Sequence, residues 1–164
     1  MRGTQKFFSG TILVVVALGV ALVPQLASSR SVSHLAQEAT SEPVPAFHTT
    51  LPDGPLPATL SPSLFDDATA QNAYSLAARI KKVLYQQPCY CHCDRSQGHG
   101  SLLDCFVSRH GSGCNICMKE AFYSYEQTRR GKKPEQIREG ILRGDWQKVD
   151  LAKYQKEYLP PVNK

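Results

Sequence analysis

The chain has 164 residues, of which 41% are hydrophobic and 20% are charged, and this composition suits one modest domain. Its 19 basic and 14 acidic side chains give a net charge of +5. The charge falls to +3 when the two basic residues of the N-terminal segment, Arg2 and Lys6, are set aside. A net positive charge this small excludes the concentrated basic face of a nucleic-acid-binding protein, and no nucleic acid is expected as a partner.

The N-terminus has the pattern of an export signal. Basic residues precede an almost entirely apolar run, residues 7–23, and the small residues Ala27 and Ser29 follow it. The run is also near the minimum length for crossing a bilayer. Residues 1–29 are therefore predicted to be a signal peptide or an N-terminal membrane anchor. Because the basic residues lie on the N-terminal side, the rest of the chain is expected outside the cytoplasm, in the periplasm or cell envelope.

The next segment is rich in proline, and its composition argues against regular helix or sheet. We interpret residues 30–62 as an extended tether, residues 63–158 as a Cys/His-rich helical domain, and residues 159–164 as a C-terminal tail. The first helix of the domain follows Asp66 or Asp67, either of which can cap it, and ends before Pro88. Its apolar face consists of Ala73, Leu76, Ala77, Ile80, Val83 and Leu84.

A second, short helix is expected at Ser101 and Asp104, which have the spacing of a capping box. Leu102, Cys105 and Phe106 would form its inner face. No segment shows a clear period-two strand pattern. The expected fold is therefore a small all-α domain whose irregular Cys/His-rich segment is stapled to it by metal.

A third helix is predicted for residues 114–130, where Gly131 supplies the left-handed position after the last turn. A fourth should start at Pro134 and stop at Gly144, with Trp146 packed beside it. The inward residues of the fourth are Ile137 and Ile141. One stripe of the third helix carries Cys114, Cys117, Met118, Ala121, Phe122 and Tyr125.

The six cysteines all lie between Cys89 and Cys117. Cys89, Cys91 and Cys93 alternate, so they either point the same way along an extended segment or wrap one ion in a tight turn. A CxxC pair at a helix N-terminus facing a Cys-rich turn is a common way to complete a tetrahedral thiolate site. The predicted metal ligands are Cys89, Cys91, Cys93, Cys105, Cys114, Cys117, His99 and His110.

This ligand set fits two four-coordinate sites or one polynuclear thiolate cluster, and His92 and Met118 are further possible ligands. Thiolate-rich sites bind soft ions, so the expected cofactor is copper(I) or zinc. Met118 beside Cys117 tilts the choice slightly towards copper(I). The expected partners are the metal ion and a metal-exchange protein of the envelope, with membrane association through the N-terminal segment.

Two alternatives remain open. An exported protein with an even number of cysteines can form structural disulfides instead, as an envelope interaction module. Alternatively, Cys114 and Cys117 can perform thiol–disulfide exchange, with Cys114 as the nucleophile. The chain has no Ser-His-Asp arrangement, phosphate loop or HExxH motif, and its carboxylates are expected mostly at helix caps and on exposed faces. An enzyme is therefore not the leading interpretation.

The cysteine segment, Pro-Cys-Tyr-Cys-His-Cys at residues 88–93, resembles the defining motif of the exported bacterial proteins named for PCYCGC, a family of no established function. The similarity extends over residues 73–141. His92 replaces the motif's glycine, a change that adds a ligand or loosens the turn. Many relatives carry a lipidated N-terminal cysteine that this chain lacks. The resemblance implies an exported, metal-binding module and assigns no catalytic residue.

Overall fold

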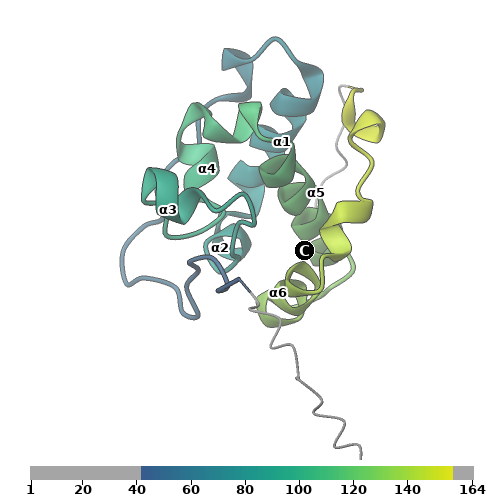
Figure 1. Ribbon diagram of the computed structural model, residues 1–164. Coiled ribbons are helices and arrows are strands. Elements are labelled where there is room, and N and C mark those ends of the chain that lie inside the picture. Colours follow the sequence, from purple (N-terminus) through teal and green to yellow (C-terminus); the bar gives the residue numbers. More distant parts are fainter. Residues whose placement is uncertain (1–41, 157–164) are drawn as a thin grey trace, which may run out of the picture. The chain divides into compact units, whose positions relative to one another are not determined.

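The computed structural model describes residues 42–156, and Figure 1 shows that this part consists of helices and loops. No strand occurs within these residues, which confirms the all-α prediction. The predicted signal or anchor at 1–29, the start of the tether and the C-terminal tail lie outside the described residues. The α-helices are α1 (Ala68–Arg79), α2 (Lys81–Leu84), α3 (Cys93–Gln97), α4 (Asp104–Val107), α5 (Asn115–Arg129) and α6 (Pro134–Leu142). The short 3-10 helices are η1 (Pro62–Leu64), η2 (Arg109–Gly113), η3 (Asp145–Lys148) and η4 (Leu151–Tyr154).

None of the helices formed by residues 42–156 is both long enough and apolar enough to cross a membrane.

The first predicted helix occurs as two, α1 and α2, separated at Ile80. Its start is as expected, because Asp67 Oδ2 accepts a hydrogen bond of 2.7 Å from the Ala70 amide. Ile80 leaves helical geometry, with φ −116° and ψ 29°, and α2 begins after it at Lys81. The predicted apolar face still points inward on both helices, since Leu76 and Leu84 are both completely buried.

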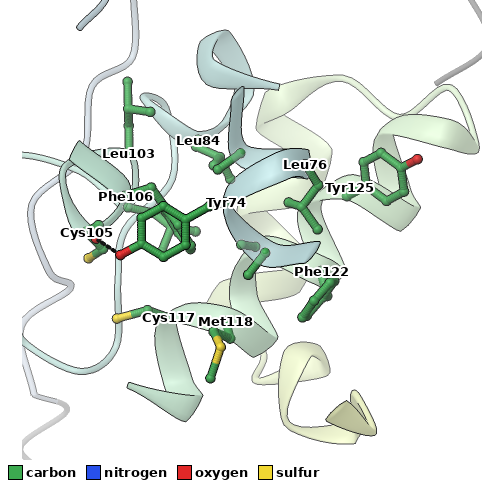
Figure 2. Packing of buried hydrophobic residues seen from close by; sticks show 14 of the residues in the cluster. Tyr74, Leu76, Leu84, Leu103, Cys105, Phe106, Cys117, Met118, Phe122 and Tyr125 are labelled. Carbon is green, nitrogen blue, oxygen red and sulfur yellow. Dashed lines mark hydrogen bonds between the residues drawn. The ribbon is translucent and has the colours of Figure 1, made fainter. Parts of the chain in front are cut away.

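Helix α5 packs against α1 and forms the centre of the core (Figures 1 and 2). Gly131 follows it with φ +76°, the left-handed conformation predicted from the sequence. Figure 2 shows the side chains of both helices interleaved, with Cys105 and Cys117 at one edge of this core. The largest completely buried apolar side chains include Tyr74, Leu76, Leu84, Leu102, Leu103, Phe106 and Phe122.

Only one half of the predicted capping box before α4 forms. Asp104 Oδ2 accepts hydrogen bonds from the amides of Gly100, at 2.7 Å, and Ser101, at 3.2 Å. The Ser101 hydroxyl is buried without a hydrogen-bond partner in the described part of the chain, and the helix begins at Asp104 rather than just after Ser101. The predicted inner face is correct, since Leu102, Cys105 and Phe106 are completely buried.

Helix α6 matches its prediction closely. It begins at Pro134, and Gly144 follows with φ +77°. Ile137 and Ile141 form a second small core with Trp146, which lies in η3. Tyr90 of the cysteine turn packs against this core.

The described part of the predicted tether, residues 42–62, has no regular helix or strand before η1, but it packs against the domain. The Leu60 amide donates a 2.9 Å hydrogen bond to the carbonyl of Phe106. The rings of His48 and Tyr85 are stacked with centroids 3.9 Å apart. Apolar and aromatic side chains in this proline-rich segment thus find partners on the domain, and the segment is not free here.

Candidate metal centre

Residues 89–93 form a tight turn, the second of the two geometries that the sequence left open. The amide of His92 donates a 3.1 Å hydrogen bond to the carbonyl of Cys89. His92 itself is left-handed, with φ 55° and ψ 34°, and helix α3 begins immediately after it at Cys93. The sequence analysis did not predict this helix. The turn wraps its three thiols around one locus instead of spacing them along a strand.

The sulfur atoms of this turn meet those of α4 and α5. Cys89 Sγ lies 3.3 Å from Cys91 Sγ, and both lie 3.5 Å from Cys117 Sγ. Cys93 Sγ lies 3.4 Å from Cys105 Sγ, and all six cysteines are free. These separations exceed the bond of about 2.05 Å in a disulfide. They approach the edge of about 3.8 Å expected for a tetrahedron of thiolates around an ion with bonds of about 2.3 Å.

Two sets of four ligand atoms result, in each of which all atoms lie within 4.8 Å of one another. The first set, here called group A, consists of Cys89, Cys91, Cys93 and Cys105. The second, group B, consists of Cys91, Cys105, His110 and Cys117. Each group has the ligand types and the number of ligands of a tetrahedral soft-metal site, so this Cys/His cluster can hold a metal ion.

Two of the eight predicted ligands, His99 and Cys114, belong to neither group. His99 Nδ1 lies 3.4 Å from Cys105 Sγ, so it contacts the cluster from its edge. Cys114 is half-buried and caps α5, where its Sγ accepts a 3.4 Å hydrogen bond from the Cys117 amide. Of the two further possible ligands, Met118 is buried in the core, and His92 pairs with Glu42 at 3.2 Å.

His110 reaches the cluster from η2, with its Nε2 3.4 Å from Cys91 Sγ. The backbone that carries it is tied to α1 through the completely buried Tyr74. The Tyr74 hydroxyl donates to the carbonyl of Ser108 at 2.6 Å and accepts from the amide of Ser112 at 3.2 Å. These bonds flank His110 on both sides and so help to position its ring.

Glu120 is a buried carboxylate beside the cluster that sequence reasoning missed. It is completely buried, and its Oε1 accepts a 2.9 Å hydrogen bond from the Tyr90 amide in the cysteine turn. Burial raises the pKa of Glu120 to about 8. The expectation that carboxylates lie at caps and exposed faces is therefore wrong for this residue. Its spacing three residues after Cys117, on the inner side of the helix, was the available signal.

Hydrogen bonds among the thiols lower the pKa of some of these cysteines and raise the pKa of others. Hydrogen bonds from neighbouring thiols, Cys105 first, lower the pKa of Cys91. Hydrogen bonding from Cys117 in the same way lowers the pKa of Cys105 to about 4. The pKa values of Cys89, Cys93 and Cys117 are raised, with hydrogen bonding to Cys105 as the largest cause in each. A cluster with such thiolates attracts soft cations.

These features define a small helical domain in which a Cys-rich turn, a CxxC helix start and a histidine converge. Residues 55–161 match the family described as "Protein of unknown function with PCYCGC motif", and the chain belongs to this family. The motif's glycine position is occupied here by His92, and its φ of 55° explains why glycine suits that position. Neither the curated proteins nor the solved structures gave a significant match.

Proposed function

We propose that this protein is an exported binding protein for a soft metal ion, either copper(I) or zinc. The observation that carries the proposal is the convergence of five free thiols and His110 into two overlapping four-ligand groups. No hard-ion ligand takes part in these groups, and thiolate with imidazole favours soft or borderline ions. The ligands come from the cysteine turn and from α3, α4, η2 and α5, so binding one ion joins the turn to the helical core.

The location we propose is the periplasm or cell envelope. Support comes from the basic residues before the apolar run at 7–23 and from the small residues Ala27 and Ser29. A bound ion would also protect neighbouring thiols, which oxidise readily outside the cytoplasm. Mass spectrometry of the native protein distinguishes a cleaved signal from an anchor that holds the chain at the membrane. An intact chain in the cytosol would contradict export.

The role we propose is metal handling, in which an envelope protein exchanges the ion, or structural support of the domain by the ion. The two roles differ in the state of the metal-free protein. If the ion is structural, a chelator should unfold the domain, because metal binding and folding are then one equilibrium. If the ion is cargo, the metal-free domain should remain folded and should pass its ion to a competing partner.

The experiment that tests the proposal is elemental analysis with thiol counting on the full chain purified from its native compartment. We expect stoichiometric copper or zinc and at least five reactive thiols after unfolding in chelator. Cys91→Ser removes a member of both groups and should abolish or strongly weaken binding. Cys114→Ser, at the start of α5 and in neither group, is the matched control and should retain the metal. Three disulfides with no metal would overturn the proposal.

A second function, thiol–disulfide exchange, is favoured by one observation. Cys114 is half-buried at the start of α5, so this residue is partly exposed, and Cys117 lies one turn further along. Cys114 would attack a substrate disulfide and release one of its sulfurs as a thiolate. Cys117 would then attack the mixed disulfide, leaving the Cys114–Cys117 disulfide and a reduced substrate. Reduction of a disulfide substrate that is lost in Cys114→Ser would support this function.

A further inference from the structure

Groups A and B are not two separate sites, because Cys91 and Cys105 belong to both. A zinc-like ion takes four ligands, and the two groups together offer six. One tetrahedral ion would therefore leave two ligand atoms of the cluster unused. Two ions can use all six only if the shared pair serves both. We propose that the cluster holds two soft metal ions bridged by the thiolates of Cys91 and Cys105. This inference rests on the proposed function, since it specifies how the same cluster binds metal.

The contacts of the shared sulfur atoms agree with a bridging position. Cys91 Sγ lies 3.3 Å from Cys89 Sγ, a member of group A alone. It also lies 3.5 Å from Cys117 Sγ and 3.4 Å from His110 Nε2, which are the members of group B alone. A ligand that belongs to one group only is here called a private ligand. Cys91 thus contacts private ligands of both groups.

The second shared sulfur also contacts a ligand that belongs to group A alone. Cys105 Sγ is 3.4 Å from Cys93 Sγ, the remaining private ligand of group A. Cys105 is completely buried in α4, with no exposed surface, so it is held in place by the core. His99 Nδ1 lies 3.4 Å from the same sulfur, where it positions the thiolate without belonging to either group. The two ions would then occupy tetrahedra that share the Cys91–Cys105 edge.

Charge is compatible with the second ion. When both groups are filled, five thiolates and a neutral imidazole carry a charge of about −5, and Cys89, Cys93, Cys105 and Cys117 are buried. Two divalent ions leave about −1, so little uncompensated charge remains in this buried region.

In this arrangement, the two ions would hold different parts of the fold together. The group A ion is held by the turn and α3 together with α4, so it closes the turn onto α4. The group B ion adds Cys117 of α5 and His110 of η2, so it joins the turn to the centre of the core. Because both ions share the bridging thiolates, loss of either thiolate should disturb both ions. Loss of a private ligand should disturb one ion first.

The test uses isotopically enriched ¹¹³Cd²⁺, a soft spin-½ ion, bound to the reduced full chain without other metals. Two ions that share a thiolate show two resonances, each split by scalar coupling to the other. We expect two equivalents of Cd²⁺ and a mutually coupled pair of signals. Zn²⁺ and Cu⁺ titrations of the same preparation should also reach two equivalents per chain.

Variants locate the bridge. Cys91→Ser and Cys105→Ser should each weaken both equivalents, and any coupling that remains would pass through the other bridging thiolate. The double variant Cys91→Ser/Cys105→Ser should lose the coupling. Cys93→Ser removes a private ligand of group A and should weaken one equivalent while the other stays tight. Cys114→Ser is the control at the start of α5 and should keep two coupled signals. Circular dichroism of each variant with and without Cd²⁺ separates an unfolded chain from a folded one that has lost an ion.

The outcomes for the bridge and for metal binding are distinguishable. A single equivalent of Cd²⁺, or two signals without coupling, would overturn the bridge and leave a soft-metal-binding protein. Retention of coupling in the double variant Cys91→Ser/Cys105→Ser would also overturn the assignment of these residues. Failure of the folded, reduced chain to bind Cd²⁺, Zn²⁺ or Cu⁺ would overturn the bridge and the proposed function together.

Discussion

Replacement of Tyr74 by phenylalanine tests how the core positions the metal ligands. Tyr74 belongs to α1 and is completely buried, and its hydroxyl reaches the segment that carries His110. The change therefore removes one hydroxyl and leaves the ring packing intact. Figure 2 shows this hydroxyl directed towards the backbone of Cys105, with a separation of 3.4 Å. Its stronger bonds are those to Ser108, at 2.6 Å, and Ser112, at 3.2 Å.

The expected change in the free energy of unfolding follows from the loss of those two hydrogen bonds. A buried polar group that loses its partner costs about 1–3 kcal/mol. Ser108 is an exposed residue, so its carbonyl can turn towards water, whereas the Ser112 amide is half-buried and less able to do so. We therefore expect Tyr74→Phe to lower the free energy of unfolding by about 2 kcal/mol. We also expect weaker metal binding, because the backbone on both sides of His110 is loosened.

The assay is urea unfolding of the reduced protein, with and without Zn²⁺, followed by circular dichroism. Tyr85→Phe is the matched control, because the described residues offer its hydroxyl no hydrogen bond and its ring stacks on His48. The control should change the free energy of unfolding by less than about 0.5 kcal/mol. If Tyr74→Phe and Tyr85→Phe destabilise the chain equally, the hydroxyl does not hold the His110 segment and the reasoning is refuted.

Two further predictions concern the surroundings of the cluster. Gly111→Ala should lower the free energy of unfolding by about 1–3 kcal/mol, because its Cβ would lie 2.9 Å from the Cys105 carbonyl oxygen. Gly113→Ala, with no atom within 4 Å of the added Cβ, should be neutral or stabilising, and equal melting temperatures would contradict the packing argument. Burial raises the pKa of Glu120 from 4.5 to about 8, so folded metal-free protein retains a proton that the unfolded chain releases. Its free energy of unfolding should therefore fall as pH rises from 4.5 to about 8, whereas Glu120→Gln, which still accepts from Tyr90, should lack this slope in urea titrations. The same slope in both proteins would contradict the assignment to Glu120.

The sequence by itself determined several of the helix ends and the chemical character of the cluster. Asp67, Gly131, Pro134 and Gly144 act through dihedral angles and hydrogen bonds within a few residues of themselves, so their effect can be read locally. The concentration of all six cysteines in residues 89–117 indicated chelation for a similar reason. Soft-metal ligands are recognised by type and spacing before their geometry is known.

Tertiary structure decided which of these ligands meet. Cys114 and Cys117 share one helix stripe, yet only Cys117 enters group B, because the capping bond to the Cys117 amide holds the Cys114 sulfur at the end of the helix. His99 and His110 are equivalent in the sequence, and the fold places only His110 in a group. The burial of Glu120 likewise depends on the cysteine turn folding over α5. Such outcomes depend on contacts between segments far apart in the chain, which local periodicity does not encode.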